Sequence, residues 1–342
     1  MGFAIISIMF FHYCENALSH YNSGIHWNIT YLYNMFIGSI GVEIFLFLSG
    51  MGLFFSLKNN NDISRFYSRR LTKVLVPYII YAPIAWFIID ITLQNLNISS
   101  LVYDLSMLSF WFDGTKTIWF IPFILMMYVA FPLVYNMIEK NKSSLNIIII
   151  IIIIIILTIF VLECFRQTNP SAYSNTSIAL TRIPIFILGA YYGKKIYNKE
   201  RMSNFTKCFF IAGIFIGFLN FYLEYLHDFD LLDSSILNTM FIVFNHFDRY
   251  LNAWYSLGLM FIIILALRKM TQLKFANKLL SIAGGISLEL YITHVTVRRI
   301  FSEADLPIWL FKYYAAVIII AIVLSVALKK IDNLILRKNI YL

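Results

Sequence analysis

Long runs of apolar residues, separated by short polar segments, organise almost the whole chain. A helix that crosses the hydrocarbon core of a bilayer needs about 20 such residues. The pattern therefore predicts an all-α, polytopic membrane protein. We expect about ten transmembrane helices, at residues 2–18, 34–55, 77–93, 117–138, 145–162, 178–193, 208–226, 252–267, 281–297 and 309–328.

Two of these segments carry additional information. Segment 145–162 contains an unbroken run of isoleucines, and its uniform apolarity predicts a lipid-facing helix with a structural role. Segment 252–267 has the least certain boundary. The residues before it, NTMFIVFNHFDRYLNAW, also fit a re-entrant or interfacial helix.

Composition supports the membrane assignment. The chain is 60% hydrophobic and 13% charged, whereas a soluble domain is about 45–50% apolar. The first apolar run has no basic flank and no small-residue cleavage site, so it does not read as a signal peptide. Cys14, Cys164 and Cys208 are too scattered for a metal or disulfide framework. No linker or soluble segment is visible, so we predict one transmembrane domain over residues 1–342.

The net charge of +9 follows the predicted topology. If the N-terminus is cytoplasmic, the cytoplasmic segments hold most lysines and arginines, and the outer loops hold most acids. The positive-inside rule then places both termini in the cytoplasm. This distribution explains the positive charge without nucleic acid and predicts a multi-pass protein of the cell (plasma or inner) membrane.

Ionisable residues inside the predicted helices are candidates for function, because they are costly to bury in a bilayer. His12, Glu43, Arg182 and His294 stand out. Counting about 1.5 Å per residue from the cytoplasmic ends of their helices puts His12 and Glu43 at similar depth. A carboxylate beside a neutral imidazole would orient a general base. Alternatively, the two groups only satisfy each other.

The stretch SLKNNNDISRFYSRRLTKVLVPY concentrates positive charge in one predicted cytoplasmic loop. One interpretation is topology, because every cytoplasmic loop attracts basic residues. The other is a phosphate clamp, because arginine forks match phosphate oxygens. Residues 69 and 73 have i, i+4 helical spacing. The candidate phosphate ligands are Arg65, Arg69, Arg70 and Lys73.

Five residues in three segments could line the path of a substrate. In SLELYITH, the residues Ser287, Tyr291 and His294 share one helix face, where they form either a polar seam between helices or part of a site. Arg182 lies in an outer half-span and either snorkels outward or contacts a substrate. Trp119 begins a span and is by default an interface anchor.

Five segments, in this order, resemble the acyltransferase 3 family of membrane acyltransferases: GVEIFLFLSGMGLFF, FYSRRLTKVLVPY, TIWFIPFILMMYVAFPLVY, RIPIFILGAYYGKK and ISLELYITH. The resemblance covers nearly the whole chain. It implies a ten-helix enzyme that takes an acyl group, usually acetyl, from coenzyme A at the cytoplasmic face. The acceptor would be an extracytoplasmic or lipid-linked glycan. His12 matches the family's first-helix histidine, and Glu43 matches its acid after Gly-Val.

The chain departs from the family pattern at two positions. The family's arginine, two residues, arginine pattern is here Arg70-Leu-Thr-Lys73, and lysine lacks the bidentate fork. Met1 stands eleven residues before His12, where the family has a basic residue. Eleven residues make about three turns, so a cation there would lie below the histidine. We expect that the natural chain begins upstream or that this copy is shortened.

The sequence thus predicts a membrane O-acyltransferase that uses acetyl-CoA and no metal to acetylate a surface or secreted polysaccharide or its lipid-linked precursor. His12 would be the base and Glu43 its partner. Any final transfer step would use this domain or a separate periplasmic or extracellular transferase. A glycan or lipid-linked-intermediate transporter remains an alternative, although the sequence shows no paired repeat. An inactive scaffold relative is another.

Overall fold

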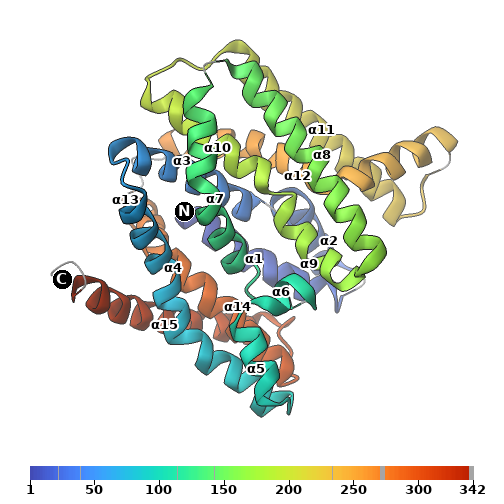
Figure 1. Ribbon diagram of the computed structural model, residues 1–342. Coiled ribbons are helices and arrows are strands. Elements are labelled where there is room, and N and C mark those ends of the chain that lie inside the picture. The colour runs from blue at the N-terminus through green and yellow to red at the C-terminus, as the bar shows by residue number, and fades with distance from the viewer. Residues whose placement is uncertain are drawn as a thin grey trace.

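The computed structural model describes residues 1–342 except 22, 39, 114, 142, 233, 270–273 and 339–342 (Figure 1). Within these residues the chain is helical and has no strand. Lys142, and the side chains of Arg268, Arg337 and Lys338, which the charge pattern places in the cytoplasm, lie outside the described part.

The helices are, in chain order, α1 (Gly2–Leu18), α2 (Ile25–Tyr33), the π-helix η1 (Asn34–Gly38), α3 (Ile40–Asn59), α4 (Ile63–Trp86), the π-helix η2 (Phe87–Leu93), α5 (Ile98–Leu105), α6 (Leu108–Phe112), α7 (Phe120–Lys140), α8 (Ser144–Thr168), α9 (Pro170–Leu180), α10 (Ile183–Tyr197), α11 (Asn204–Asp228), α12 (Ser235–Lys269), α13 (Lys274–Gly285), α14 (Ser287–Glu303) and α15 (Phe311–Lys338).

Each predicted span overlaps a helix, but fewer than ten helices have the length and apolarity of a span. Seven do so among the described residues, or up to eight if the bent pair α13 and α14 counts as one. Helices α1 and α10 have 17 and 15 residues, which is short of a full crossing. The protein is therefore a multi-pass helical membrane protein, and the count of ten and the cytoplasmic termini stay predictions.

The basic stretch is not a loop. Helix α4 begins at Ile63, where the Asp62 carboxylate accepts the backbone N–H of Arg65 at 3.0 Å and caps the helix. The helix continues through Pro77 and Pro83 instead of starting at Pro77. In a membrane bundle, neighbouring groups compensate for the backbone hydrogen bond that proline removes. The predicted phosphate ligands therefore lie on the first turns of α4.

Two other boundaries differ from the predicted ones. Helix α12 runs unbroken over Ser235–Lys269, so there is no separate re-entrant or interfacial helix before residue 252. The predicted span 281–297 is instead broken at Ile286, where α13 and α14 meet at 74°. A second break, at Thr181 and Arg182, separates α9 from α10.

Glycines set the tightest helix contact, between α3 and α10. A Cβ atom at Gly50 would lie 2.1 Å from the Phe186 carbonyl oxygen, and one at Gly189 would lie 2.1 Å from the Phe47 carbonyl oxygen. The two backbones thus touch directly, as small residues allow in membrane bundles. The isoleucine-rich α8, by contrast, exposes most of its side chains, as its composition predicts.

Contacts between distant residues define two ends of the bundle. At one end, Lys58 pairs with Glu139, and the Lys194 ammonium donates to the Asn141 carbonyl oxygen at 3.1 Å. We call it the basic end, because it also carries the first turns of α4. At the opposite end, the Asn175 amide donates to the Phe110 carbonyl oxygen at 2.9 Å, and Lys116 contacts a serine of α9.

Candidate active site

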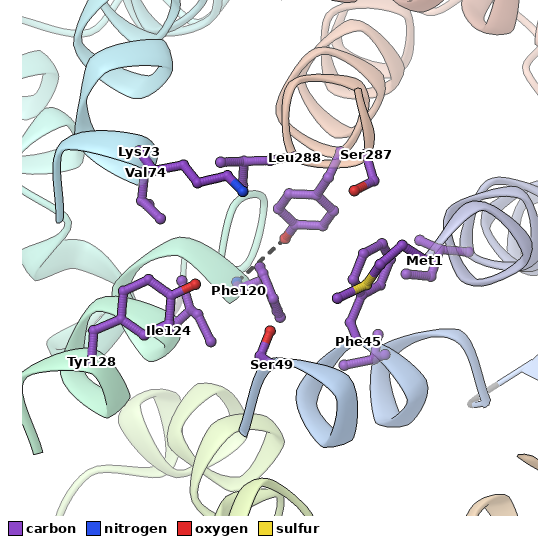
Figure 2. A pocket seen from close by; sticks show the side chains of 13 residues that line it. Met1, Phe45, Ser49, Lys73, Val74, Phe120, Ile124, Tyr128, Ser287 and Leu288 are labelled. Carbon is purple, nitrogen blue, oxygen red and sulfur yellow. Dashed lines mark hydrogen bonds between the residues drawn. The ribbon is translucent and has the colours of Figure 1, made fainter. Parts of the chain in front are cut away.

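A pocket of about 110 Å³ lies between α1, α3, α4, α7 and α14 (Figure 2). Its walls are mainly apolar, with Phe45 of α3 and Phe120 of α7 in contact across one side at 6.2 Å between ring centroids. The polar groups that line it include Lys73, Ser287 and Tyr291, all of which the sequence singled out. The structure therefore gathers three predicted site residues around one cavity.

One part of this pocket is lined by Lys73, a cation on α4, the helix whose first turns lie at the basic end. The Lys73 ammonium points into the pocket in Figure 2 and makes no hydrogen bond or ion pair with any described residue. Arg70 is half-buried and interacts electrostatically with Lys73 and with Tyr128, which also lines the pocket. The position of Met1 matters here, because its side chain lines the same pocket as Lys73.

A third cation, Lys329 of α15, approaches Lys73 from the other side. Its ammonium group lies 2.8 Å from the carboxylate of Glu289 and 3.4 Å from that of Asp332. Both acids are buried, so the pair of carboxylates fixes Lys329 in place. Arg65 and Arg69 are exposed on the first two turns of α4, and Arg69 donates to the Ser56 hydroxyl at 3.4 Å. Neither lines the pocket.

Helices α1 and α14 lead from the pocket to two histidines. Ile8 and Tyr291 line the pocket, and His12 and His294 follow them by about one turn on the same two helices. The two imidazole ring centroids are 5.5 Å apart. Both histidines therefore lie just beyond the inner end of the pocket.

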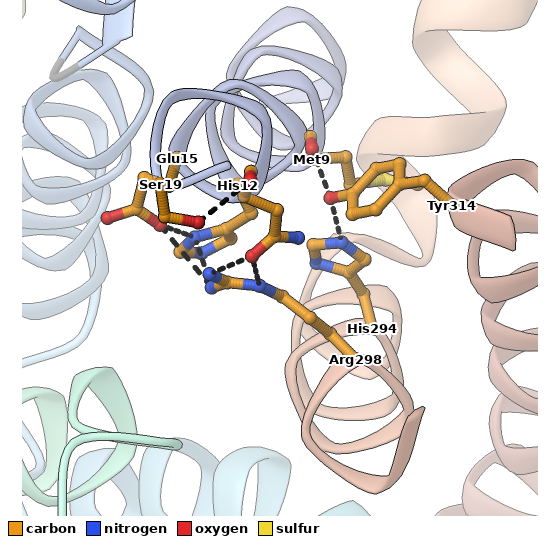
Figure 3. Close-up of polar contacts among 8 residues, drawn as sticks. Met9, His12, Glu15, Ser19, His294, Arg298 and Tyr314 are labelled. Carbon is orange, nitrogen blue, oxygen red and sulfur yellow. Dashed lines mark hydrogen bonds and ion pairs between the residues drawn. The ribbon is translucent and has the colours of Figure 1, made fainter. Parts of the chain in front are cut away.

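His12 belongs to a polar cluster that joins α1 to α14 (Figure 3). Its Nδ1 atom lies 2.7 Å from the Glu15 carboxylate, and Arg298 ion-pairs with the same carboxylate at 3.3 Å. Arg298 also donates to the Asn16 side-chain oxygen at 2.8 Å. Nη1 of Arg298 also lies 2.9 Å from the same Nδ1 atom. In the tautomer whose Nδ1–H donates to Glu15, Nε2 carries the lone pair, whereas an Nδ1 that accepts from Arg298 leaves the proton on Nε2. The His12 side chain is 17% exposed.

His294 is fully buried beside this cluster and has a fixed orientation. The Tyr314 hydroxyl donates to the Met9 carbonyl oxygen, so its oxygen accepts the Nε2–H of His294 at 2.7 Å. The Nδ1 atom of His294 therefore carries a lone pair, and it has no hydrogen-bond partner among the described residues. Leaving a buried acceptor unpaired costs about 1–3 kcal/mol, which favours a bound donor group at this point.

The predicted pair of His12 and Glu43 does not form. Glu43 is paired with Arg182, whose Nε donates to the carboxylate at 2.9 Å. The depth estimate failed because it assumed that the two helices start level with each other. In the structure, Gly38 packs against Phe11 and Gly41 packs against Ile8 and Ala4, so Glu43 lies level with the first turns of α1 and not with His12.

Arg182 is turned inward and does not snorkel. Its second contact is the Ile178 carbonyl oxygen, which accepts from Nη1 at 2.7 Å. Its guanidinium carbon also lies 5.3 Å from the ring centroid of Trp119, within cation–π range. Trp119 immediately precedes Phe120, and Glu43 follows Val42, so this ion pair flanks the wall of the pocket.

Four residues of this site were missed in the sequence: Glu15, Arg298, Tyr314 and Lys329. Glu15 follows His12 by three residues, a spacing that brings side chains together on a helix. Arg298 follows His294 by four residues, and the charge pattern assigned it to an outer loop. The signal for both was present in the spacing. Tyr314 and Lys329 come from α15, and no local spacing connects them to the site.

Comparison with known proteins gives one match. Residues 2–330 match the sequence profile of the acyltransferase 3 family, described as an acyltransferase domain. No curated protein and no solved structure matches the chain. Within the described residues, no three His, Cys, Asp or Glu side chains are grouped to hold a metal ion.

Proposed function

Because the chain belongs to the acyltransferase 3 family of membrane acyltransferases, we propose that it is an O-acetyltransferase. It moves an acetyl group from acetyl-CoA to a hydroxyl of a surface or secreted polysaccharide or of its lipid-linked precursor. One observation carries this proposal. A pocket lined by Lys73 lies about one helix turn from His12, a histidine that contacts a carboxylate.

The pocket suits the donor. Coenzyme A carries phosphates at one end and a thioester at the other, joined by a long, mostly uncharged arm. Lys73 and Arg70, with Lys329 nearby, would bind the phosphates at the basic end. The arm would lie along the wall formed by Phe45 and Phe120, with its thioester toward the histidines. Arg65 and Arg69 would contribute only long-range attraction, since both are exposed.

The chemistry is one acyl transfer. With the Nδ1–H of His12 directed at Glu15, its Nε2 takes the proton of the acceptor hydroxyl as the hydroxyl oxygen attacks the thioester carbonyl carbon. A carbon–oxygen bond forms, the carbon–sulfur bond breaks, and the coenzyme A thiolate leaves and takes up the proton. Glu15 stabilises the imidazolium that forms in between, and Arg298 holds Glu15 in position. The unpaired Nδ1 of His294 accepts a hydrogen bond from the acceptor.

The ion pair of Glu43 and Arg182 has a positioning role in this scheme. It connects α3 to the break before α10, and α3 also supplies Phe45 to the pocket. Removing one partner would leave the other as a buried unpaired charge, which is strongly destabilising. We therefore assign Glu43 to the architecture of the pocket and His12 to the reaction.

The test uses purified protein and intact cells. His12→Ala is expected to lower acetyl transfer to the cell's glycans by about 10²–10⁴-fold, the usual contribution of a general base. His227→Ala is the matched control, because His227 is exposed, stacks on Phe241 and lies far from His12 in the sequence. Mass spectrometry of the glycans and thiol release from acetyl-CoA give the two readouts. Wild-type acetylation in His12→Ala cells, at equal expression, would contradict the proposal.

A further inference from the structure

A second cavity, of about 230 Å³, lies at the opposite end of the bundle between α8, α9 and α12. Its walls differ from those of the first pocket because most of its lining residues are polar or charged. Asn245, His246, Asp248 and Arg249 come from consecutive turns of α12, and Tyr173 comes from α9. The proposed reaction uses none of these side chains.

Arg249 is an exposed arginine that lines this cavity. It makes no hydrogen bond or ion pair with any other described residue, although it lies in electrostatic range of Asp248 and Arg182. Two less exposed arginines do have carboxylate partners, since Arg182 pairs with Glu43 and Arg298 pairs with Glu15. A guanidinium that lines a cavity with its donors free is available to a ligand.

Asp248, its neighbour, is fixed by the surrounding helices. Its Oδ1 atom accepts hydrogen bonds from the side-chain amides of Asn220 at 2.9 Å and Asn252 at 2.5 Å. The carboxylate is therefore held in one orientation while it lines the cavity. The wall combines a fixed acceptor in Asp248, a free donor in Arg249 and an exposed amide in Asn245.

The cavity is connected to the site through α9. Thr181 lines the cavity, and the next residue, Arg182, holds Glu43 beside the first pocket. His12 and Arg298 lie toward this same end, because α1 and α14 lead away from Lys73. The two cavities thus lie at opposite ends of the bundle.

We propose that this polar cavity binds a sugar unit of the acceptor glycan. The inference rests on the proposed function, and it names the place where the acceptor is recognised. Neighbouring hydroxyls of a sugar both donate and accept, so they match a carboxylate, an amide and a guanidinium in one wall. An acyl chain would leave these polar groups unpaired, at a cost of about 1–3 kcal/mol each.

Cysteine protection tests binding separately from catalysis. Asn245→Cys is made in a chain that carries Cys164→Ser and Cys208→Ser, and its labelling by a maleimide is timed. The probe is the water-soluble saccharide fraction that mild acid releases from the surface and membranes of the native cells. The saccharides are expected to slow labelling of Asn245→Cys and to leave Thr239→Cys, on an exposed turn of the same helix, unchanged. The same fraction is also tested after periodate treatment, which breaks the carbon–carbon bond between neighbouring hydroxyl-bearing carbons. It is then expected to give no protection.

Arg249→Gln is then added to the Asn245→Cys chain. It is expected to raise the saccharide concentration for half-protection about tenfold, as loss of one hydrogen bond from a charged group implies. Lys312→Gln, which removes an exposed cation from α15, is the control.

The outcomes separate the two proposals. Absence of protection in a protein that still acetylates glycan would overturn the sugar site and leave the acetyltransferase function standing. Protection without any acetyl transfer from acetyl-CoA would support the sugar site and reject the function. Protection by phospholipid vesicles alone, with no effect of saccharide, would mean a lipid headgroup site and would overturn the inference.

Discussion

At the scale of single residues, the position of Arg298 explains how the apolar helix α1 can carry the charged side chain of Glu15 beside His12. Glu15 would be an isolated carboxylate on an apolar helix, and Arg298 supplies its counter-charge from α14 at 3.3 Å. The same guanidinium binds Asn16 at 2.8 Å, which fixes its distance from His12. One side chain thus neutralises the carboxylate and aligns the two helices that lead from the pocket.

Arg298→Gln is expected to lower kcat by about 10–100-fold, the equivalent of losing a charged hydrogen bond. The KM for acetyl-CoA is expected to stay unchanged, because Arg298 does not line the donor pocket. Arg299→Gln, on the next position of the same helix, removes a cation that pairs with Glu303 and is the control. Steady-state kinetics on purified protein measures both constants. A rise in KM with unchanged kcat would mean that Arg298 binds the donor instead.

For Lys73 we expect the opposite result, a change in KM for acetyl-CoA and not in kcat. Lys73→Gln is expected to raise the KM for acetyl-CoA about tenfold and to leave kcat nearly unchanged, because phosphate contact is made equally in ground and transition states. Lys140→Gln removes an exposed cation at the same end of the bundle and is expected to have no effect. Equal KM values for the two variants would exclude Lys73 from phosphate binding.

At the scale of helices, direct backbone contact between α3 and α10 determines the geometry of the site. Helix α3 carries Glu43 and Phe45, and Arg182 directly precedes α10. Gly50 and Gly189 let the two helices approach until a carbonyl oxygen of each lies 2.1 Å from the place of a missing Cβ. The distance between these helices, and with it the wall of the pocket, depends on these two glycines.

Gly50→Ala is expected to destabilise the protein by about 1–3 kcal/mol, because the added methyl group forces the helices apart. Gly52→Ala is an exact chemical match on the same helix, and nothing lies within 4 Å of its added Cβ. It is expected to be neutral or slightly stabilising, since alanine favours helix over glycine. Thermal unfolding in detergent, followed by size-exclusion chromatography, compares the two. Equal melting temperatures would show that α3 and α10 pack less closely than described.

At the scale of the whole molecule, the sequence predicted which segments are helices better than how they pack. Apolar runs identify helices because the bilayer requires length and hydrophobicity, and every predicted span overlaps one. Such runs do not fix the register between two helices, since isoleucine and leucine can slide past one another. Register here depends on local contacts such as Gly38 against Phe11, and this is why the pairing of His12 with Glu43 was wrong.

For the candidate site, too, the sequence predicted some of the residues but not how distant helices bring others to them. His12, Lys73, Tyr291 and His294 lie in or beside one pocket because each is a polar residue that an apolar helix must place in the interior. Lys329 comes from a distant helix, and the breaks at Ile286 and Arg182 are visible only in three dimensions.

The arrangement of two cavities at opposite ends has a consequence for topology. If the basic end faces the cytoplasm, as the positive-inside rule predicts, then acetyl-CoA reaches Lys73 from inside the cell and the polar cavity opens outside. Asn60→Cys at the basic end and Thr168→Cys at the opposite end, both exposed, report the two sides in a chain that lacks Cys164 and Cys208. In intact cells, a membrane-impermeant maleimide is expected to label Thr168→Cys and to label Asn60→Cys only after permeabilisation. The reverse pattern would place the polar cavity in the cytoplasm, and a donor from the cytoplasm could then no longer enter beside Lys73.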